Sequence, residues 1–395
     1  MNIIYNISIW LYLMVMHVLS LFNHKAKLWI EGRKGIFSEL KEKIQKNQNI
    51  VWFHCASLGE FEQAKPMIQA YRLKFPKHKI LLTFFSPSGF HNIKQNNLVD
   101  WIFFLPADTK SNAKKFINLV NPIKAIFIKY EFWFNYIQEL KKNNIALYSV
   151  SSVFRDNQLF FKYKWFARKL YNITHFFVQD KKSAQLLKSI GLKNHTISGD
   201  TRFDSVLANI QNFKKMPLIE KFCKNTKTII CGSTWRYDEI LLVKYIKNHN
   251  KINFIIATHE LSSVSDLQKK TGGLLYSKAN KNNILTTNVL IIDSIGLLSN
   301  VYKYGDLAYI GGGFGSGIHN ILEAVTFGLP VIFGPNYKKF NEAICLIKKK
   351  GAISISNYEE LKIAINTFNN FDKNIALDYI KENSGATKKI LRLMN

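Results

Sequence analysis

A glycine-rich turn between two apolar runs is the part of this sequence best suited to binding an anion. Glycines at 311, 312, 313, 315 and 317 follow the strand-like run Leu307–Ile310, and a helix is expected from near His319 to Gly328. Glycine lets backbone N–H groups approach a ligand closely, and free N–H groups at a helix start favour phosphate. Because His319 and Glu323 are four residues apart, they would share a helix face, where Glu323 could hold a ribose hydroxyl.

Two plainer interpretations of these residues stay open. Asn320 and Glu323 also fit a helix N-cap residue and its capping-box partner three positions later. A glycine turn between a strand and a helix also occurs for packing alone. The turn and the helix by themselves do not decide between these interpretations and a ligand site.

The stretch resembles the C-terminal nucleotide-binding signature of the 3-deoxy-D-manno-octulosonic acid (Kdo) transferases of lipopolysaccharide synthesis. The matching residues are Gly312-Gly313, Gly317, His319-Asn320-Ile321-Leu322-Glu323, Gly328, Pro330, Gly334-Pro335 and Phe340-Asn341-Glu342. Ile321 stands where the family has a proline, and the Phe and Asn of the last motif are exchanged. The resemblance implies that Gly317 and the run from His319 to Glu323 bind the nucleotide of a CMP-sugar donor.

A carboxylate near the N-terminus is the first candidate for the chemistry itself. Glu60 follows the predicted strand Ile50–His54 and a tight turn, and it opens a helix to about Lys74. The helix dipole favours its anionic form, which could accept a proton from a sugar hydroxyl. A Glu in a first helical turn is also ordinary helix chemistry, and Glu62 follows two residues later. The segment ASLGEF resembles the A-S-x-G-E segment of the Kdo transferases, which implies that Glu60, not Glu62, is the catalytic base.

Glu131 is the second candidate carboxylate. It lies in the segment KYEFWFN, where a strand ends and a helix is expected to begin, and open α/β sheets place ligands at such strand ends. The segment resembles the family's E-x-x-W-P-N pattern, with Phe134 in place of the proline. The resemblance implies that Glu131 supports acceptor binding or the geometry of Glu60. The alternative is again an ordinary first-turn Glu.

The second half of the chain offers further groups for a phosphate. In the turn after the strand at 228–232, Ser233 offers N–H and hydroxyl donors, and Arg236 adds a fixed positive charge. The resemblance implies further contacts with the CMP moiety from residues at 258–259 and 295–297, namely Thr258, His259, Ile295, Gly296 and Leu297. Leu297 replaces the Glu that the family has in that turn, so a contact through that carboxylate is not expected.

The elements that must position these residues form a regular pattern. Short apolar strands alternate with helical segments of roughly 10–15 residues, which predicts parallel sheets. With the resemblance, this predicts a GT-B fold, in which two doubly wound Rossmann-like domains face each other across a cleft. We expect an N-terminal anchor helix at 1–24, an acceptor-binding domain at 25–204, a CMP-sugar-binding domain at 205–375, and a C-terminal helix at 376–395 that packs back on the first domain.

Residues 3–22 are almost wholly apolar, and about 20 such residues can span a bilayer. No basic segment precedes the run and no cleavage site follows it, which argues against a signal peptide. Lys25, Lys27, Arg33 and Lys34 come next and predict a cytoplasmic location for the rest of the chain. A helix lying in the membrane interface, or one buried on the domain, is the alternative. The resemblance implies the cytoplasmic face of the inner membrane.

Composition adds weaker constraints. The chain has 395 residues and a formal net charge of +28, which favours anionic partners, although its lysines are spread along the whole sequence. Its four cysteines, Cys55, Cys223, Cys231 and Cys345, form no C-x-x-C pair, which favours a reduced chain without a cysteine-based zinc site. The sequence has no Asp-x-Asp motif for a divalent metal, no Walker A pattern and no G-x-S-x-G elbow.

The resemblance therefore implies an inverting, metal-independent transferase without a cofactor, which moves Kdo from CMP-Kdo to the lipid A precursor. Glu60 would be its base, and anionic lipid of the inner membrane a further partner, whereas nucleic acid would not be one. A GT-B enzyme with another nucleotide-sugar donor is one rival, against which ASLGEF argues. The other is a basic, membrane-tethered binding protein without catalysis. No motif reports the number of Kdo residues added, the acylation preference or the oligomeric state.

Overall fold

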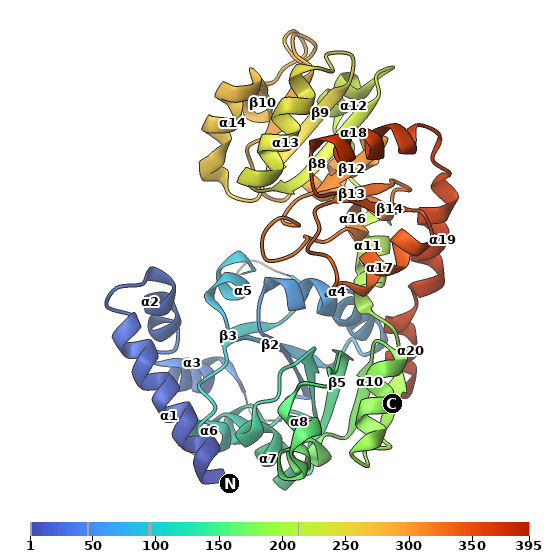
Figure 1. Cartoon of the computed structure of the whole chain (residues 1–395). Coiled ribbons are helices and arrows are strands. Elements are labelled where there is room, and N and C mark those ends of the chain that lie inside the picture. Colours follow the sequence, from blue (N-terminus) through green and yellow to red (C-terminus); the bar gives the residue numbers. More distant parts are fainter. Residues whose placement is uncertain (1, 46, 94–96, 212, 395) are drawn as a thin grey trace. The chain divides into compact units, whose positions relative to one another are not determined.

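The computed structural model describes residues 2–45, 47–93, 97–211 and 213–394, and the chain divides into two compact units (Figure 1). Unit 1 comprises Met1–Ser205 and Ser384–Asn395, and unit 2 comprises Val206–Asn383. The first division falls one residue after the expected position. The return to unit 1 begins at Ser384 rather than at 376, because helix α19 (Lys373–Asn383) packs within unit 2.

Unit 1 contains a seven-stranded parallel sheet of order β3-β2-β1-β4-β5-β6-β7 in the described part of the chain. The strands are β1 (Ile50–Cys55), β2 (Lys79–Phe84), β3 (Trp101–Phe104), β4 (Lys124–Ile128), β5 (Ala146–Ser152), β6 (His175–Val178) and β7 (His195–Ile197). All of β1 is buried, as expected for a parallel strand covered on both faces. Successive residues point to opposite faces, so Trp52 and Phe53 enter two different apolar cores.

Helices cover both faces of this sheet. They are α1 (Asn2–Leu19), α2 (His24–Glu31), α3 (Ile36–Lys43), α4 (Leu58–Lys74), α5 (Pro87–Asn92), α6 (Lys110–Val120), α7 (Phe134–Lys142), α8 (Leu159–Lys162), α9 (Lys164–Ala167), α10 (Lys181–Ser189) and α20 (Ala386–Leu393), while α11 (Thr201–Gln211) crosses into unit 2. Two lysines fix the returning segment that carries α20: Lys74 donates to the Leu391 carbonyl at 3.1 Å, and Lys124 donates to the Met394 carbonyl at 2.9 Å.

Unit 2 repeats the layout with a seven-stranded parallel sheet of order β10-β11-β9-β8-β12-β13-β14 among the described residues. Its strands are β8 (Thr228–Thr234), β9 (Asn253–Thr258), β10 (Leu274–Leu275), β11 (Val289–Ile292), β12 (Leu307–Ile310), β13 (Val331–Phe333) and β14 (Ala352–Ser354). Its helices are α12 (Pro217–Cys223), α13 (Arg236–Lys247), α14 (Val264–Thr271), α15 (Leu298–Val301), α16 (Leu322–Val325), α17 (Asn341–Lys348), α18 (Tyr358–Thr367) and α19. The two parallel α/β sheets confirm the fold class expected from the alternating pattern.

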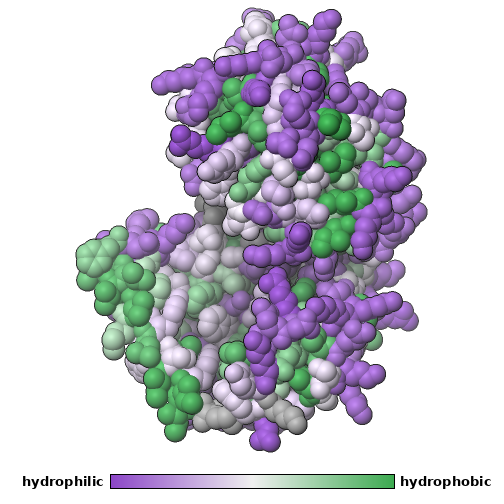
Figure 2. All heavy atoms as spheres, viewed as in Figure 1, coloured by the Kyte–Doolittle hydropathy of each residue, from purple (hydrophilic) through white to green (hydrophobic). Residues whose placement is uncertain are grey.

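Helix α1 lies on unit 1 with most of its apolar residues exposed, and Figure 2 shows a continuous hydrophobic strip there. The exposed residues of this strip are Ile3, Ile4, Ile7, Trp10, Leu11, Met14, Val15, Val18, Leu19, Leu21 and Phe22. Tyr5 and Asn6, in contrast, reach polar partners of the domain, namely Asp108 and Asn135. Among the described residues, no helix meets the length and hydropathy needed to cross a membrane.

The basic flank expected after this helix is only partly present. Lys25, Lys27 and Lys34 are exposed, but Arg33 folds inward. Its guanidinium lies 3.7 Å over the Trp29 ring and donates to the carbonyls of Trp29, Phe85 and Leu105 at 2.7–3.0 Å. Burial lowers its pKa to about 9. Arg33 therefore fastens α2 to the domain and does not belong to an exposed basic flank.

Candidate active site

The two predicted carboxylates flank the switch point of the unit 1 sheet. From β1 the chain adds β2 and β3 on one side, and it then returns to place β4 on the other side. Ligands of open α/β sheets bind at the carboxyl ends of strands beside such a reversal. Glu60 follows β1 and Glu131 follows β4, so the sheet brings together two residues that are 71 positions apart in the sequence.

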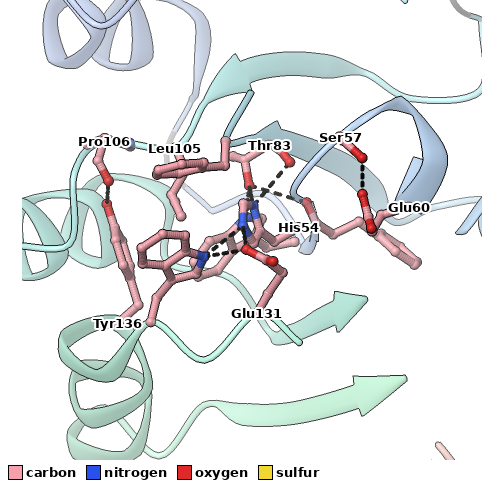
Figure 3. Close-up of polar contacts among 12 residues, drawn as sticks. His54, Ser57, Glu60, Thr83, Leu105, Pro106, Glu131 and Tyr136 are labelled. Atoms are coloured by element: carbon pink, nitrogen blue, oxygen red, sulfur yellow. Dashed lines mark hydrogen bonds and ion pairs between the residues drawn. The ribbon is translucent and has the colours of Figure 1, made fainter. Parts of the chain in front are cut away.

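Glu60 lies in the first turn of α4, which begins two residues earlier than expected, with Ser57 as its N-cap. The Ser57 hydroxyl donates to Glu60 Oε2 (Figure 3). The Lys129 ammonium lies 3.6 Å from Glu60 Oε1. Lys129 has a φ of +62°, a left-handed conformation that is uncommon outside glycine, and its N–H donates to the Val150 carbonyl at 2.8 Å. Both oxygens of Glu60 therefore have a partner, while its side chain stays 16% exposed.

Glu131 lies in the loop between β4 and α7, and α7 begins only at Phe134, so the interpretation as a first-turn Glu is wrong. Glu131 Oε2 accepts from Trp133 Nε1 at 2.7 Å and lies 3.1 Å from Nε2 of the buried His54. Only 13% of the Glu131 side chain is exposed. The carboxylate is therefore held from within the domain, with one edge left open.

Neighbouring groups show that both carboxylates share this edge of the sheet. Burial raises the pKa of the Cys55 thiol at the end of β1, and the charges of Glu60 and Glu131 raise it further. Burial also raises the pKa of Tyr130, while the nearby Arg155 and Arg202 lower it and Asp200 and Glu60 raise it. The site thus combines two carboxylates with guanidinium groups that can attract an anionic substrate.

In unit 2 the predicted donor residues gather at the carboxyl ends of four adjacent strands, on both sides of the switch point between β8 and β12. Ser233 lies at the end of β8 with a φ of +53°, and Arg236 is the exposed first residue of α13. Thr258 ends β9 and His259 follows it. Ile295 is 85% exposed.

Further along the chain, Gly296 turns with a φ of +90°, and Leu297 is the N-cap of α15. Burial raises the pKa of Tyr302, and the charge of Glu323 raises it further. The Tyr302 hydroxyl lies against Gly232, where a Cβ would come within 1.9 Å of it. Tyr302 thus lies between the end of β8 and the charge of Glu323.

The glycine turn after β12 differs from the expectation, because the protein itself uses several of its N–H groups. Gly312 N–H donates to Asp238 at 2.9 Å, Gly315 and Gly317 N–H donate to the Gly312 carbonyl at 2.9 and 3.3 Å, and His319 N–H donates to the Gly311 carbonyl at 3.1 Å. These four groups are not free for a phosphate. A Cβ on Gly311 would lie 2.2 Å from the Ser233 carbonyl oxygen, so the alternative of a turn made for packing is right at this position.

The helix expected from His319 is also shorter than predicted, because the His319 N–H bonds back to Gly311 and holds this segment in a turn. Helix α16 begins at Leu322 with Ile321 as its N-cap, and both side chains are fully buried, so only their backbone can meet a ligand. Asn320 Oδ1 accepts from Leu322 N–H at 3.2 Å, and its amide donates to Glu323 Oε1 at 3.1 Å. The prediction of a helix start at His319 is therefore wrong. Asn320 acts as a cap through its bond to the Leu322 N–H, but Glu323 contacts the Asn320 side chain and not the Asn320 backbone N–H of a capping box.

Three aromatic rings pack against one another in this site. Trp235 Nε1 donates to His319 Nε2 at 2.9 Å with the two ring planes only 12° apart, so the rings lie nearly in one plane. His259 stacks on both, with centroid distances of 4.4 Å to Trp235 and 4.5 Å to His319. Burial, and then His259, lower the pKa of His319 to about 4, so its imidazole is neutral at physiological pH.

Comparison with known proteins finds a similarity to the Kdo transferases. The family model described as 3-deoxy-D-manno-octulosonic-acid transferase (kdotransferase) matches residues 30–205. The 3-deoxy-D-manno-octulosonic acid transferase of Rickettsia bellii is 28% identical over 330 residues, which cover 80% of this chain and 78% of the relative. That of Haemophilus influenzae is 27% identical over 370 residues, which cover 87% and 86%. The chain is therefore similar to Kdo transferases over most of its length, and residues 30–205 match the family model.

Solved structures agree with the fold expected for a Kdo transferase. A glycosyltransferase of Rickettsia africae has a TM-score of 0.59 at 13% identity and covers 88% of this chain and 98% of that one. A UDP-N-acetylglucosamine 2-epimerase of Neisseria meningitidis has a TM-score of 0.59 at 15% identity, with coverage of 88% and 100%. At these identities the likeness shows the fold alone, and it confirms the GT-B class.

Several residues of this candidate site were missed in the sequence. His54 and Lys129 carried a signal, because a titratable residue inside or ending a buried strand is unusual. Asp238 is fully buried and accepts from Trp235 N–H, Gly312 N–H and the Tyr309 hydroxyl at 2.7–2.9 Å. Its position three residues after Trp235 fits a helix cap, but no local pattern shows its bond to Gly312.

Proposed function

We propose that this protein transfers Kdo from CMP-Kdo to the disaccharide lipid A precursor, with Glu60 as the general base. The observation that carries the proposal is the placement of Glu60. This carboxylate lies beside the switch point of the unit 1 sheet, within the segment that matches the Kdo transferase family, and Ser57 and Lys129 orient it. The similarity to Kdo transferases supports the donor, and the acceptor is our inference from the same similarity.

The chemical step follows from this geometry. Glu60 accepts the proton of an acceptor hydroxyl while that oxygen forms a bond to the anomeric carbon of Kdo. The bond between that carbon and the phosphate oxygen of CMP breaks on the opposite face, and CMP leaves with the electron pair, which inverts the centre. The Lys129 ammonium lies 3.6 Å from the carboxylate and helps to hold it in place.

In unit 2, side chains contribute more to binding the donor than the backbone of the glycine turn does. Arg236 and the Ser233 hydroxyl can stabilise negative charge on the departing phosphate without a metal ion. His319 accepts from Trp235 through Nε2, so as a neutral imidazole it carries its proton on Nδ1 and can donate from there. Glu323 can accept from a ribose hydroxyl.

We propose further that the exposed apolar strip of α1 lies in the cytoplasmic interface of the inner membrane. Lys25, Lys27 and Lys34 are exposed beside it and match anionic headgroups. Binding to vesicles that contain phosphatidylglycerol should fall when Trp10, which is 64% exposed in the strip, becomes Glu. The same change at Ile363, which is 65% exposed in unit 2, should leave binding unchanged. Equal losses from both variants would remove the membrane proposal.

Transfer from CMP-Kdo to the tetra-acylated lipid A precursor, measured in detergent with EDTA by product mass, tests the function. Glu60→Gln should reduce kcat at least 100-fold, because a positioned general base contributes about 10²–10⁴-fold. Glu62→Gln is the matched control, since Glu62 is exposed and, among the described residues, pairs only with Lys65 at 3.8 Å. Transfer by the Glu60 variant at the wild-type rate would remove Glu60 as base. If transfer occurs only from a UDP-sugar, the proposed donor is wrong. If EDTA abolishes transfer, the proposed metal-free mechanism is wrong.

A further inference from the structure

A chain of buried hydrogen bonds ends on Glu131. Trp52 Nε1 donates to Thr83 Oγ1 at 2.8 Å, and Thr83 Oγ1 lies 2.8 Å from His54 Nδ1 (Figure 3). On the far side of the ring, His54 Nε2 lies 3.1 Å from Glu131 Oε2. Trp52, Thr83 and His54 are all fully buried. The chain therefore leads from the core of unit 1 to a carboxylate at the edge of its sheet.

The proton of the Thr83 hydroxyl decides how the chain is oriented. This oxygen already accepts from Trp52, and its own proton has two acceptors within reach: His54 Nδ1 at 2.8 Å and the Phe53 carbonyl at 3.5 Å. The shorter contact has normal hydrogen-bond length, and the longer one lies at the limit. Thr83 therefore donates to His54 Nδ1, which leaves the imidazole proton on Nε2.

The opposite tautomer would leave His54 poorly matched to its surroundings. With its proton on Nδ1, His54 could donate to the Thr83 carbonyl at 3.1 Å. A bare Nε2 could then accept from Trp133 Nε1–H at 3.0 Å, but that N–H lies closer to Glu131 Oε2, at 2.7 Å. The lone pair of Nε2 would also face the Glu131 oxygen at 3.1 Å in a buried position. The arrangement in which Thr83 donates to His54, and His54 to Glu131, satisfies every group in the chain.

Glu131 gains a fixed orientation from this arrangement. Oε2 receives both His54 Nε2–H and Trp133 Nε1–H, whereas Oε1 has no partner among the described residues. Glu60 differs, because Ser57 contacts one of its oxygens and the Lys129 ammonium lies near the other, although each of these oxygens can accept a further proton donor. Glu131 Oε1 has no such partner among the described residues, so it can accept from a hydroxyl group of the substrate.

We propose that Thr83 and His54 are positioning residues, which fix the Nε2–H tautomer of His54 and thereby aim Glu131 Oε1 at a hydroxyl of the acceptor sugar. The proposed tautomer of His54 can be right whatever reaction the protein catalyses. The assignment of the hydroxyl to an acceptor sugar rests on the proposed function.

Nuclear magnetic resonance tests the tautomer without any assay of activity. In protein labelled with ¹⁵N at histidine, the His54 signals are identified by their absence in His54→Gln. We expect a neutral ring with its proton on Nε2 in the wild type and in Thr83→Ser, which keeps the hydroxyl. Thr83→Val should move the proton to Nδ1 or produce an imidazolium. An Nδ1–H tautomer or an imidazolium in the wild type would overturn the proposal, as would an unchanged signal in Thr83→Val.

A stability control is needed because Thr83→Val also leaves the Trp52 indole N–H without its acceptor. Trp52→Phe removes that donor and keeps the hydroxyl, so it should lower stability without moving the His54 proton. A shift of the tautomer by Trp52→Phe as large as that by Thr83→Val would assign the effect to packing and overturn the proposal.

Kinetics then test the consequence for Glu131. Thr83→Val should lower kcat about tenfold, with little change in KM for CMP-Kdo, and Thr83→Ser should restore it. His54→Gln places an amide donor near the position of Nε2 whatever residue 83 is. In that background Thr83→Val should therefore cost less than about twofold. The same tenfold loss in both backgrounds would overturn the relay. If the wild-type protein shows the expected His54 tautomer but no transferase activity, the proposed function is wrong and the tautomer assignment stands.

Discussion

Tyr5→Phe is the change that best tests how α1 is held on unit 1. The Tyr5 hydroxyl donates to Oδ2 of the buried Asp108, which also accepts the N–H groups of Asn135 and Tyr136 at 3.1 and 3.0 Å. These bonds join the start of α1 to the loop after β3 and to the start of α7. Removing one hydroxyl should therefore loosen the docked helix without changing its shape.

The stability lost in Tyr5→Phe depends on whether Asp108 is ionised. Burial raises the pKa of Asp108 from an ordinary 3.8 to about 6, and the bonds from Tyr5, Asn135 and Tyr136 limit the rise. A hydrogen bond to a charged group contributes about 1.5–3 kcal/mol, against about 1 kcal/mol for a neutral one. We expect Tyr5→Phe to cost about 2 kcal/mol at pH 8, where Asp108 is ionised, and about 1 kcal/mol at pH 4.5.

The sign of the pH dependence of the wild type follows from the same shift. A carboxyl group whose pKa is higher in the folded state binds protons more readily there. Its contribution to stability is fully present below pH 3.8 and is lost as the pH rises through about 6. Tyr5→Phe removes a bond that lowers this pKa, so the loss should continue to higher pH in the variant.

Hydrogen exchange of the α1 amides in detergent-free buffer measures these energies. An isolated helix of this length is marginal in water, so exchange in α1 reports its release from the domain. A cost of 2 kcal/mol corresponds to exchange about 30-fold faster at pH 8, after correction for intrinsic rates. Tyr12→Phe is the control, because its ring packs on Trp29 while no hydrogen bond of its hydroxyl occurs among the described contacts. An effect of Tyr5→Phe that is the same at both pH values, or no larger than that of Tyr12→Phe, would refute the reasoning.

Two further predictions concern unit 2. Gly311→Ala should destabilise it by about 3 kcal/mol or more in urea denaturation, because the new Cβ would lie 2.2 Å from the Ser233 carbonyl oxygen. Gly315→Ala, whose Cβ would lie 3.6 Å from its nearest neighbour, should cost less than about 1 kcal/mol, and equal costs would contradict the clash. Burial and His259 lower the pKa of His319 to about 4, so its contribution to stability is present above pH 6.5 and is lost as the pH falls through 4. The unfolding free energy should fall by about 2 kcal/mol over this range, allowing for partial exposure, and His319→Gln should remove that part of the fall.

The convergence of the site residues could be predicted from the sequence because it depends on local patterns. Each of Glu60, Glu131, Ser233 and His259 follows an apolar run at the expected spacing. In a parallel sheet, all such strand ends reach one edge. The order of the strands places them beside the switch points, and no long-range contact needs to be known for that step.

The partners of those residues could not be predicted, because they come from distant parts of the chain. The Gly312 N–H looked available for phosphate, but it binds Asp238, which precedes it by 74 residues. Arg33 looked like part of a basic flank, but it lies on Trp29 and donates to the carbonyls of Phe85 and Leu105, far along the chain. The spacing of residues along the sequence predicts which of them share a face of a helix or strand. It does not predict which buried acceptor from a distant part of the chain will bind a given donor.

In both units a buried polar side chain links the two loops beside the switch point of the sheet. A reversal of strand order separates the loops that follow the two central strands, so something must hold those loops together beneath a ligand. In unit 1, His54 of β1 contacts Glu131, which follows β4. In unit 2, Asp238, which follows β8, accepts from Gly312, which follows β12. In each unit a buried polar side chain from one side of the reversal fixes the loop on the other side. Because such a group is costly to leave unpaired, it holds the site in place before any substrate arrives.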